Sequence, residues 1–384
     1  MATYFSAEEF KSRRKNLQAL LAENRLDGVL LFRQESMYYL TGYDTSGYAK
    51  YQAMFMTADG KFCLITRSAD AAQARETSII EDIRIWVDGK DANPALDIRK
   101  ALDDLGARGK RLGVEYDAYG LSHARGRLLD AALEGFCTTV EASHLMRRLQ
   151  IVKSPQELAY IRRAGELCAK ASEAALKETR PGVLEGTIRG KMMQAILDGG
   201  GDPPAGRWPM GSGRSALLVR YHTGERRIAA QDQVTHEFGA AYRHYHVATM
   251  YVMIMGKPDP RHVSMFTTAR DALAACQDAM RPGRTLGDVF AAHTKVFDDA
   301  GLKGKYLNAC GYTMGIAYPP TWMDEPMIDR GNPQVIAPGM VFFTHMILVD
   351  SASGLAMSLG ETAIIEETRC RPVAQAPREL TVIG

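Results

Sequence analysis

Hydrophobic positions in the first 150 residues recur with two different periods. Apolar residues three and four positions apart predict amphipathic helices, and short apolar runs bounded by turn residues predict buried strands. The expected helices are 7–24, 69–77, 94–105 and 122–133, and the expected strands are 28–32, 53–56, 62–66, 83–87, 111–115 and 138–141. Alternating strands and helices are typical of an α/β domain. Residues 1–150 are therefore predicted to form an N-terminal α/β domain.

The segment Lys153-Ser154-Pro155 predicts the start of a second domain, residues 151–384. Ser154 is a capping residue, Pro155 takes the first helical position, and Glu157 follows the cap by three residues. Together these residues predict a helix that runs to about residue 178.

The second domain contains an internal repeat. Helices expected at 155–178 and 262–280 both end at an Arg-Pro-Gly turn, and a second helix follows each turn, at 185–197 and 286–299. Three further residues recur at the same constant spacing, namely Gly186 with Gly287, Asp198 with Asp299, and Gly200 with Gly301. We expect two α-α-β units related by a pseudo-twofold axis, with any site formed between their sheets.

The segment 232–258 combines β-structure with titratable side chains. Two apolar stretches, around Val234 and at 250–255, flank a short polar segment and predict a β-hairpin. Glu237, His244 and His246 lie on this otherwise apolar and aromatic hairpin. A buried carboxylate or imidazole has a shifted pKa and is a candidate for proton transfer. A surface hairpin with a solvated polar edge would contain the same residues.

Composition restricts the classes of partner. The net charge of the 384 residues is +2, with basic and acidic residues interspersed, which argues against nucleic acid or a membrane as the main partner. The six cysteines form no CxxC pair and have no histidine at metal-ligand spacing, which is typical of reduced thiols in a cytoplasmic protein. No secretory signal and no apolar run of membrane-spanning length is visible.

The order of these motifs resembles that of the creatinase and Xaa-Pro dipeptidase family. The matching phrases are the KSPxE helix start, the Arg-Pro-Gly repeat, Gly311–Gly315, the Pro-Gly-Met-Val-Phe run at 338–342 and the closing strand 361–366. The resemblance implies an α+β protein whose second domain has the pita-bread fold. It also implies a homodimer in which a partner's N-terminal domain covers the active site, with Tyr43, Tyr48 and Tyr51 as candidates to close the neighbour's pocket.

Metal-dependent members of the family bind two divalent ions through two aspartates, a histidine and two glutamates. At these five positions the present chain has Glu237, Ala248, Tyr312, His345 and Gly360, with Glu361 next to the last. Alanine and glycine have no side-chain ligand atoms. The resemblance therefore implies no dinuclear centre, and we expect no cofactor.

The metal-free branch of the family provides a functional hypothesis. The Gly311–Trp322 segment, with its Pro-Pro-x-Trp end, and the pairing of Glu237 with Tyr245-His246 resemble ectoine hydrolase, which opens a cyclic amidine. The histidine that acts in creatinase falls near Arg220, beside His222. The resemblance implies a metal-independent hydrolase of a C–N bond in a small non-peptide substrate.

Candidate roles follow from this hypothesis. Glu237 would act as base or nucleophile, and His246, His222 or His345 would transfer protons. Glu361 and Tyr312 would bind the cationic part of the substrate, Arg220 or Arg243 its carboxylate, and Trp322 would wall the pocket.

Two alternatives stay open. One is an Xaa-Pro dipeptidase with an unusual metal site made of Glu237, His246, His345 and Glu361. The other is a catalytically inactive binding homologue, because the fold alone does not determine function. At single positions, His345 could be a hydrogen-bonded core histidine, Arg220 a strand-edge charge, and Tyr312 a residue that only fills volume.

Overall fold

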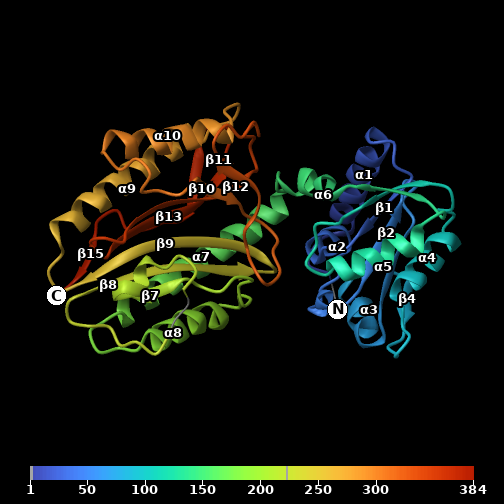
Figure 1. The fold of residues 1–384 in the computed structure, drawn as a ribbon, viewed down its shortest axis with the longest axis horizontal. Helices are drawn as coiled ribbons and strands as arrows, with labels where there is room; N and C mark the ends of the chain where they lie inside the picture. The colour runs from blue at the N-terminus through green and yellow to red at the C-terminus, as the bar shows by residue number, and fades with distance from the viewer. Residues whose placement is uncertain (1–2, 222–223) are drawn as a thin grey trace. The chain divides into compact units, whose positions relative to one another are not determined.

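The computed structural model describes residues 3–221 and 224–384. The chain divides into two compact units, Met1–Gln150 and Ile151–Gly384, called unit 1 and unit 2 below. Figure 1 shows the ribbon of the chain coloured along the sequence. None of the described helices is long and apolar enough to cross a membrane.

Unit 1 is an α/β domain built on a six-stranded mixed sheet with the order β4-β3-β2-β1-β5-β6. Its strands are β1 (Gly28–Leu31), β2 (Ala53–Thr57), β3 (Phe62–Arg67), β4 (Ile83–Trp86), β5 (Arg111–Val114) and β6 (Thr138–Glu141). Its helices are α1 (Ala7–Glu23), α2 (Gln34–Thr41), α3 (Ala71–Thr77), α4 (Pro94–Asp104), α5 (His123–Leu133) and α6 (Ser143–Gln150). The predicted N-terminal α/β fold is confirmed. Helix α2 lies where the sequence pattern indicated no helix.

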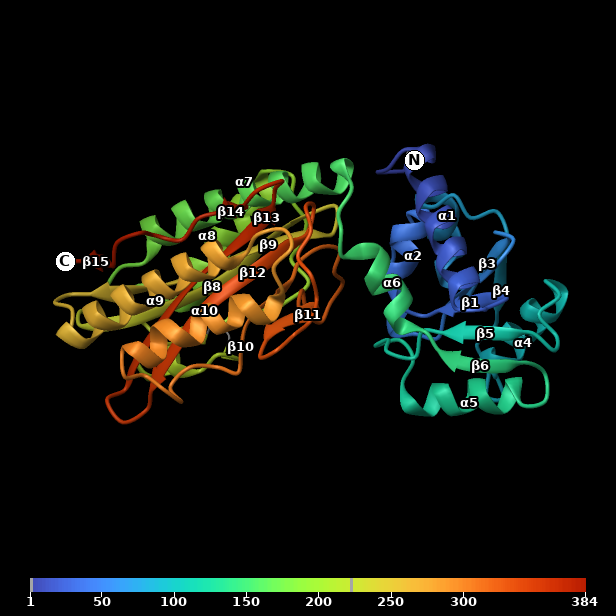
Figure 2. The same ribbon diagram turned by 90° about the horizontal axis from the view of Figure 1, so that it is seen from above.

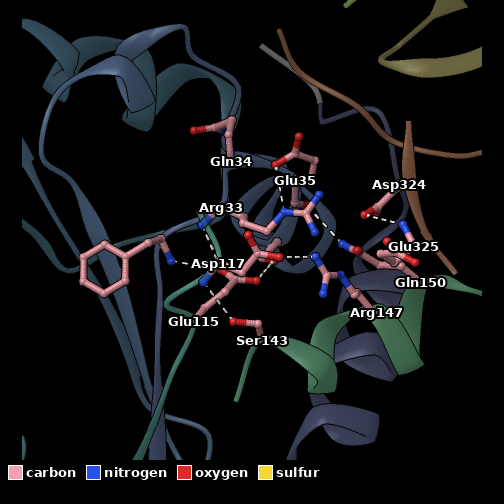
Figure 3. Close-up of polar contacts among 12 residues, drawn as sticks. Arg33, Gln34, Glu35, Glu115, Asp117, Ser143, Arg147, Gln150, Asp324 and Glu325 are labelled. Carbon is pink, nitrogen blue, oxygen red and sulfur yellow. Dashed lines mark hydrogen bonds and ion pairs between the residues drawn. The ribbon is translucent and has the colours of Figure 1, made fainter. Parts of the chain in front are cut away.

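A buried carboxylate fixes the start of α2. Glu115 directly follows β5 and accepts hydrogen bonds from the backbone N–H groups of Phe32 (2.9 Å) and Arg33 (2.8 Å) and from the Ser36 hydroxyl (2.5 Å; Figure 3). Arg33 is the N-cap of α2 and its side chain makes no capping bond. Glu115, 82 residues away, instead accepts from the N–H of the N-cap residue, as the glutamate of a capping box does. Burial raises the pKa of Glu115 to about 7, while Arg33 opposes the increase.

Two of the three tyrosines expected at a partner's pocket are buried inside unit 1. The Tyr43 hydroxyl donates to Gln52 Oε1 at 3.2 Å, and the Tyr51 hydroxyl donates to the Arg125 carbonyl at 3.4 Å. Only Tyr48 among the three is partly exposed. The homodimer stays a prediction, and Tyr48 is the residue of this set whose position suits such a contact.

Unit 2 has a nine-stranded sheet in which seven strands follow the order β11-β10-β12-β13-β9-β8-β7, while β14 pairs with β13 and β15 with β9. The strands are β7 (Met210–Ser212), β8 (Asp232–Tyr242), β9 (Tyr245–Met255), β10 (Ala309–Thr313), β11 (Asp324–Asp329), β12 (Val341–Asp350), β13 (Leu355–Ile365), β14 (Cys370–Ala374) and β15 (Thr381–Ile383). The helices are α7 (Pro155–Glu178), α8 (Glu185–Asp198), α9 (Pro260–Ala279) and α10 (Leu286–Asp299). Figures 1 and 2 show α7 beside α8 and α9 beside α10. The predicted α+β class and pita-bread domain are confirmed.

The internal repeat is visible in the backbone. Gly182 and Gly283 end the two Arg-Pro-Gly turns with φ of 84° and 87°, values that favour glycine, and their N–H groups donate to Ile228 and Ile336 respectively. The sheets of the two repeats do not stay separate, because β9 pairs with β13 in antiparallel register. They form one continuous sheet, and any site lies on that sheet rather than between two.

Strand register assigns each side chain of this sheet to one of two faces. Helices cover the face that contains His236, Tyr251 and Glu361, because α7 contacts the first two through Thr179 and Ser172, and α9 contacts Glu361 through Gln277. We call this the helix face. The opposite face, called the inner face, carries Glu237, Met250, Gly360 and His345 in one cross-strand row, as the pairs Glu237–Met250, Met250–Gly360 and Gly360–His345 show.

The capping function of Glu115 can be tested by its removal. Glu115→Ala leaves two buried N–H groups and the Ser36 hydroxyl without their acceptor, so we expect a loss of about 2–4 kcal/mol in the free energy of unfolding. Chemical denaturation followed by circular dichroism measures it. Glu81→Ala, at an exposed position of the same unit, should change stability by less than about 0.5 kcal/mol. Equal effects of the two changes would contradict the capping function.

Candidate active site

Glu237 lies on the inner face of β8 with a carboxylate that receives no hydrogen bond from the described residues. Its backbone N–H donates to the Pro209 carbonyl at 2.8 Å, which fixes the strand position but leaves the side chain free. Burial raises the pKa of Glu237 to about 7, and the positive charge of Arg220 opposes the increase. A carboxylate in this state can take up or release a proton near neutral pH.

A small cavity of about 20 Å³ adjoins Glu237, which is room for roughly one water molecule. Its wall is largely apolar, with contributions from Leu218, Met250, Ile347 and Val349. Ser358 also lines the cavity, is 4% exposed, and its hydroxyl has no hydrogen-bond partner among the described residues. An unpaired buried hydroxyl is costly, so this position suits contact with water or substrate.

Tyr312 and Trp322 form a buried pair on the same side of the sheet. The Trp322 Nε1–H donates to the Tyr312 hydroxyl at 3.0 Å. Tyr312 pairs with Phe343, which places it on the inner face, and its ring lies 5.9 Å from the His345 ring between centroids. Burial raises the pKa of Tyr312 well above its usual value, the charge of Glu237 adds to the increase, and Trp322 and Arg220 oppose it. Glu237, Arg220, Tyr312 and Trp322 therefore share one electrostatic environment.

His345 lies on the inner face, opposite Gly360 in the register. It is 8% exposed, and its Nδ1 has no hydrogen-bond partner in the part of the chain that the structure describes. Burial lowers the pKa of His345 to about 4. The imidazole is therefore neutral near pH 7.

His246 is held at both ring nitrogens. Its Nδ1 lies 2.8 Å from the His244 carbonyl and must donate, while Nε2 accepts from the Ala205 N–H at 2.9 Å. Burial lowers the pKa of His246 to about 4. Uptake of a proton at Nε2 would break the hydrogen bond from Ala205, and loss of the proton at Nδ1 would break the one to His244. The neighbouring His244 is in the two-residue turn with Arg243, where both residues have positive φ (65° and 52°), and not in a strand.

Glu361 lies on the helix face and is separated from Glu237 by the sheet itself. Its carboxylate accepts hydrogen bonds from Gln277 (2.6 Å), the Ala376 N–H (2.9 Å) and Arg378 (3.0 Å), and the residue is fully buried. Sequence reasoning placed it with the catalytic group because it adjoins Gly360. In a strand, however, adjacent side chains point to opposite faces.

Arg220 is exposed on the segment that follows the short 3₁₀ helix Gly213–Leu217. Glu185 anchors this segment: the buried carboxylate accepts from the Ser212 N–H (2.7 Å), the Ser212 hydroxyl (2.6 Å) and the Gly224 N–H (3.1 Å). His222 lies outside the described residues. Sequence reasoning missed both Glu185 and Ser358. Only the alternation of β13, which puts Ser358 on the same face as Gly360, could have indicated the latter.

The five family metal positions all lie on the inner face, but their side chains do not fit a two-metal centre. Ala248 and Gly360 provide no ligand atom, and a Cβ atom at Gly360 would lie 2.8 Å from Met250 Cγ and 2.9 Å from Phe343 Cζ. Apolar side chains thus occupy the space of the last carboxylate. Across the described residues no group of three or more His, Cys, Asp or Glu side chains is placed to hold a metal.

Two family models match this chain. A model of the creatinase/prolidase N-terminal domain matches residues 13–152, and the model of metallopeptidase family M24 matches residues 159–368. The chain therefore belongs to family M24 of hydrolases, with a creatinase-type N-terminal domain.

Relatives within the family differ in chemistry. An uncharacterised hydrolase/peptidase, y4tM, of Sinorhizobium fredii is 26% identical over 99% of this chain and 98% of its own. Ectoine hydrolase of Halomonas elongata is 24% identical over 98% of both chains. The crystal structure of dipeptidase PepE from Mycobacterium ulcerans matches with a TM-score of 0.86 at 23% identity, covering 99% of both chains, which shows the shared fold.

The two carboxylates on opposite faces of the sheet, Glu237 and Glu361, predict different effects of mutation on stability. In Glu361→Gln one oxygen becomes an NH₂ group that faces at least one of the three donors and the charge of Arg378 is left without its counter-ion, so we expect a loss of about 2 kcal/mol in the free energy of unfolding. Glu237→Gln removes a half-buried charge that has no hydrogen-bond donor, and stability should stay within about 1 kcal/mol or increase. Denaturant titration of both variants checks the contrast. A larger loss for Glu237→Gln would contradict the assigned faces.

Proposed function

We propose that this protein is a metal-independent hydrolase that cleaves a C–N bond in a small non-peptide substrate, by ring opening of a cyclic amidine of the ectoine type. The observation that supports the proposal most is the state of Glu237. It is the one carboxylate at the five family metal positions, it has no hydrogen-bond donor among the described residues, and it lines an apolar cavity.

Two features favour this chemistry over peptide hydrolysis with a metal. At two of the positions where metal-dependent relatives have carboxylate ligands, this chain has Ala248 and Gly360. The four residues of the alternative metal site also do not lie together. Of those four, Glu361 lies on the helix face and His246 already uses both nitrogens.

A binding homologue without catalysis is less well supported. An unpaired Glu237 carboxylate and an unpaired Ser358 hydroxyl both cost free energy of folding, and a site that only binds an apolar group does not require them.

In the proposed reaction Glu237 acts in its ionised form, either as base toward a water molecule or as nucleophile toward the amidine carbon. Arg220 provides a positive charge near Glu237 and Tyr312 and would bind the substrate carboxylate. Met250, Phe343 and Trp322 provide the apolar wall on which the substrate body packs.

Metal content and turnover test the proposal together. We expect purified protein to contain far less than one equivalent of metal by elemental mass spectrometry and to open the ring of ectoine at a rate that a chelator does not change. Glu237→Gln should reduce kcat at least about 10²-fold, because it removes the proton acceptor. Chelator-sensitive turnover, or full turnover by Glu237→Gln, would refute the mechanism.

The pH dependence of kcat/KM should report Glu237 in the free enzyme. Activity requires the carboxylate, so it should increase with pH through a midpoint near 7. Arg220→Gln removes a charge that favours the carboxylate, so the midpoint should move upward, by roughly half a pH unit. Arg214→Gln, an exposed arginine on the same segment, is the matched control and should leave the midpoint unchanged. A downward shift in Arg220→Gln would contradict the assigned pair.

A further inference from the structure

We propose that Tyr312 is the proton donor to the leaving nitrogen and that Trp322 is the positioning residue that orients its hydroxyl. This inference rests on the proposed hydrolase function and adds the acid that the reaction requires. Loss of a C–N bond needs a proton on nitrogen, because an amide or amidine anion is a poor leaving group.

The hydrogen bond within the pair determines which role each atom takes. The indole Nε1–H can only donate, so the Tyr312 oxygen accepts at 3.0 Å. The phenol keeps its own O–H, and no acceptor for it occurs among the described residues. That proton is available to a substrate atom.

Packing holds the indole in place. A Cβ atom at Gly206 would lie 2.5 Å from Trp322 Cε3, and one at Gly239 would lie 3.6 Å from the same atom. Trp322 therefore packs against backbone that lacks side chains on the inner face, and it is 4% exposed. A ring fixed in this way can hold the phenol in one orientation.

Tyr312 and Glu237 act from opposite sides of the inner face. They are on β10 and β8, with β12, β13 and β9 between them in the sheet order, yet the charge of Glu237 affects Tyr312 directly. Arg220 interacts with both. A small substrate between the two would meet a base on one side and a donor on the other.

The histidines fit the donor role less well. His246 uses both nitrogens in hydrogen bonds to the backbone. The ring of His345 lies beside Tyr312, but with its pKa near 4 only about one molecule in 10³ carries the imidazolium at pH 7. The groups around Tyr312 are Trp322, Phe343, His345, Glu237 and Arg220, and burial keeps the phenol protonated throughout the neutral range.

The proposed step balances as the addition of one water molecule. Glu237 takes one proton from water while the water oxygen forms a bond to the carbon of the protonated amidine. The C–N bond then breaks as the new hydroxyl group becomes the C=O group of the product; the leaving nitrogen takes the Tyr312 proton, and the proton released from the hydroxyl group passes to the product amine. Trp322 Nε1–H and the charge of Arg220 stabilise the Tyr312 phenolate. The proton held by Glu237 then passes through solvent or product to the Tyr312 oxygen, which restores both groups.

The test compares kcat, KM and the pH profile of the wild type, Tyr312→Phe and Trp322→Phe with ectoine as substrate. Tyr312→Phe should reduce kcat by about 10²- to 10³-fold with KM within a few-fold, and Trp322→Phe should reduce kcat by roughly 10-fold. Wild-type kcat should increase through neutral pH and then stay level to about pH 9, because the donor remains protonated. A decrease just above neutral pH would point to a histidine and overturn the assignment.

Two controls separate chemistry from packing. Tyr251→Phe removes a buried tyrosine hydroxyl on the helix face, where it contacts Ser172 and not the site, so kcat should stay within a few-fold of the wild type. Thermal unfolding of each variant shows whether the fold is kept. If Tyr312→Phe were unstable, the level alkaline limb of the wild-type profile would still test the assignment.

The outcomes also distinguish the two proposals. If wild-type turnover requires metal, or if Glu237→Gln retains it, the proposed function fails. If turnover is metal-independent and needs Glu237 but Tyr312→Phe keeps the full kcat, only the Tyr312 assignment fails. Absence of wild-type turnover on ectoine, cyclic ureas and simple amides would overturn both.

Discussion

The register of the unit 2 sheet is the constraint on which the site depends. Pairing of Glu237 with Met250, of Met250 with Gly360 and of Gly360 with His345 puts these residues in one row on the face away from the helices. A shift of one residue in any strand would exchange the two faces of that strand. The same register sends Glu361 into a buried cluster with Gln277 and Arg378. Glu237 thus receives no hydrogen bond from the described residues, whereas Glu361 is held in an ion pair with Arg378.

The absence of hydrogen bonds to its carboxylate distinguishes Glu237 from three other glutamates of the chain. Glu115, Glu185 and Glu361 are buried carboxylates that each accept at least three hydrogen bonds, and each fixes a local junction of the fold. Glu237 has only the charge of Arg220 to offset its burial. Buried charges without partners are expensive, and they persist in proteins mainly where function requires them. This contrast within one chain is a stronger argument than the pKa of any single group.

Sequence reasoning recovered the fold because its signals are local. The Ser154 cap, the Arg-Pro-Gly turns and the strand alternation each depend on a few neighbouring residues, and helix α7 begins and ends where they indicate. The site was only partly predictable. Glu237 and Tyr312 were named from the sequence and lie on the same face of the sheet, and Trp322 donates to Tyr312, whereas Glu361, Glu185 and Ser358 depend on strand register and on loops that pack from far along the chain. The turn at Arg243-His244 likewise lacks the glycine or asparagine that would have indicated it.

Under the proposed function, the inner face combines the scaffold of a metallopeptidase family with a reactive site that binds no metal. Ala248 and Gly360 provide no ligand atom at two of the five positions, and Met250 and Phe343 pack against Gly360, so this part of the face is apolar. A more apolar surrounding raises the pKa of the remaining carboxylate and of the phenol at the former histidine position, because both charged forms are less well solvated. The pKa of the Glu237 carboxyl group thus lies closer to neutral pH, and the pKa of the Tyr312 phenol lies further above it. In the proposed mechanism these opposite shifts make Glu237 the base and Tyr312 the acid, which is the arrangement that hydrolysis without a Lewis acid requires.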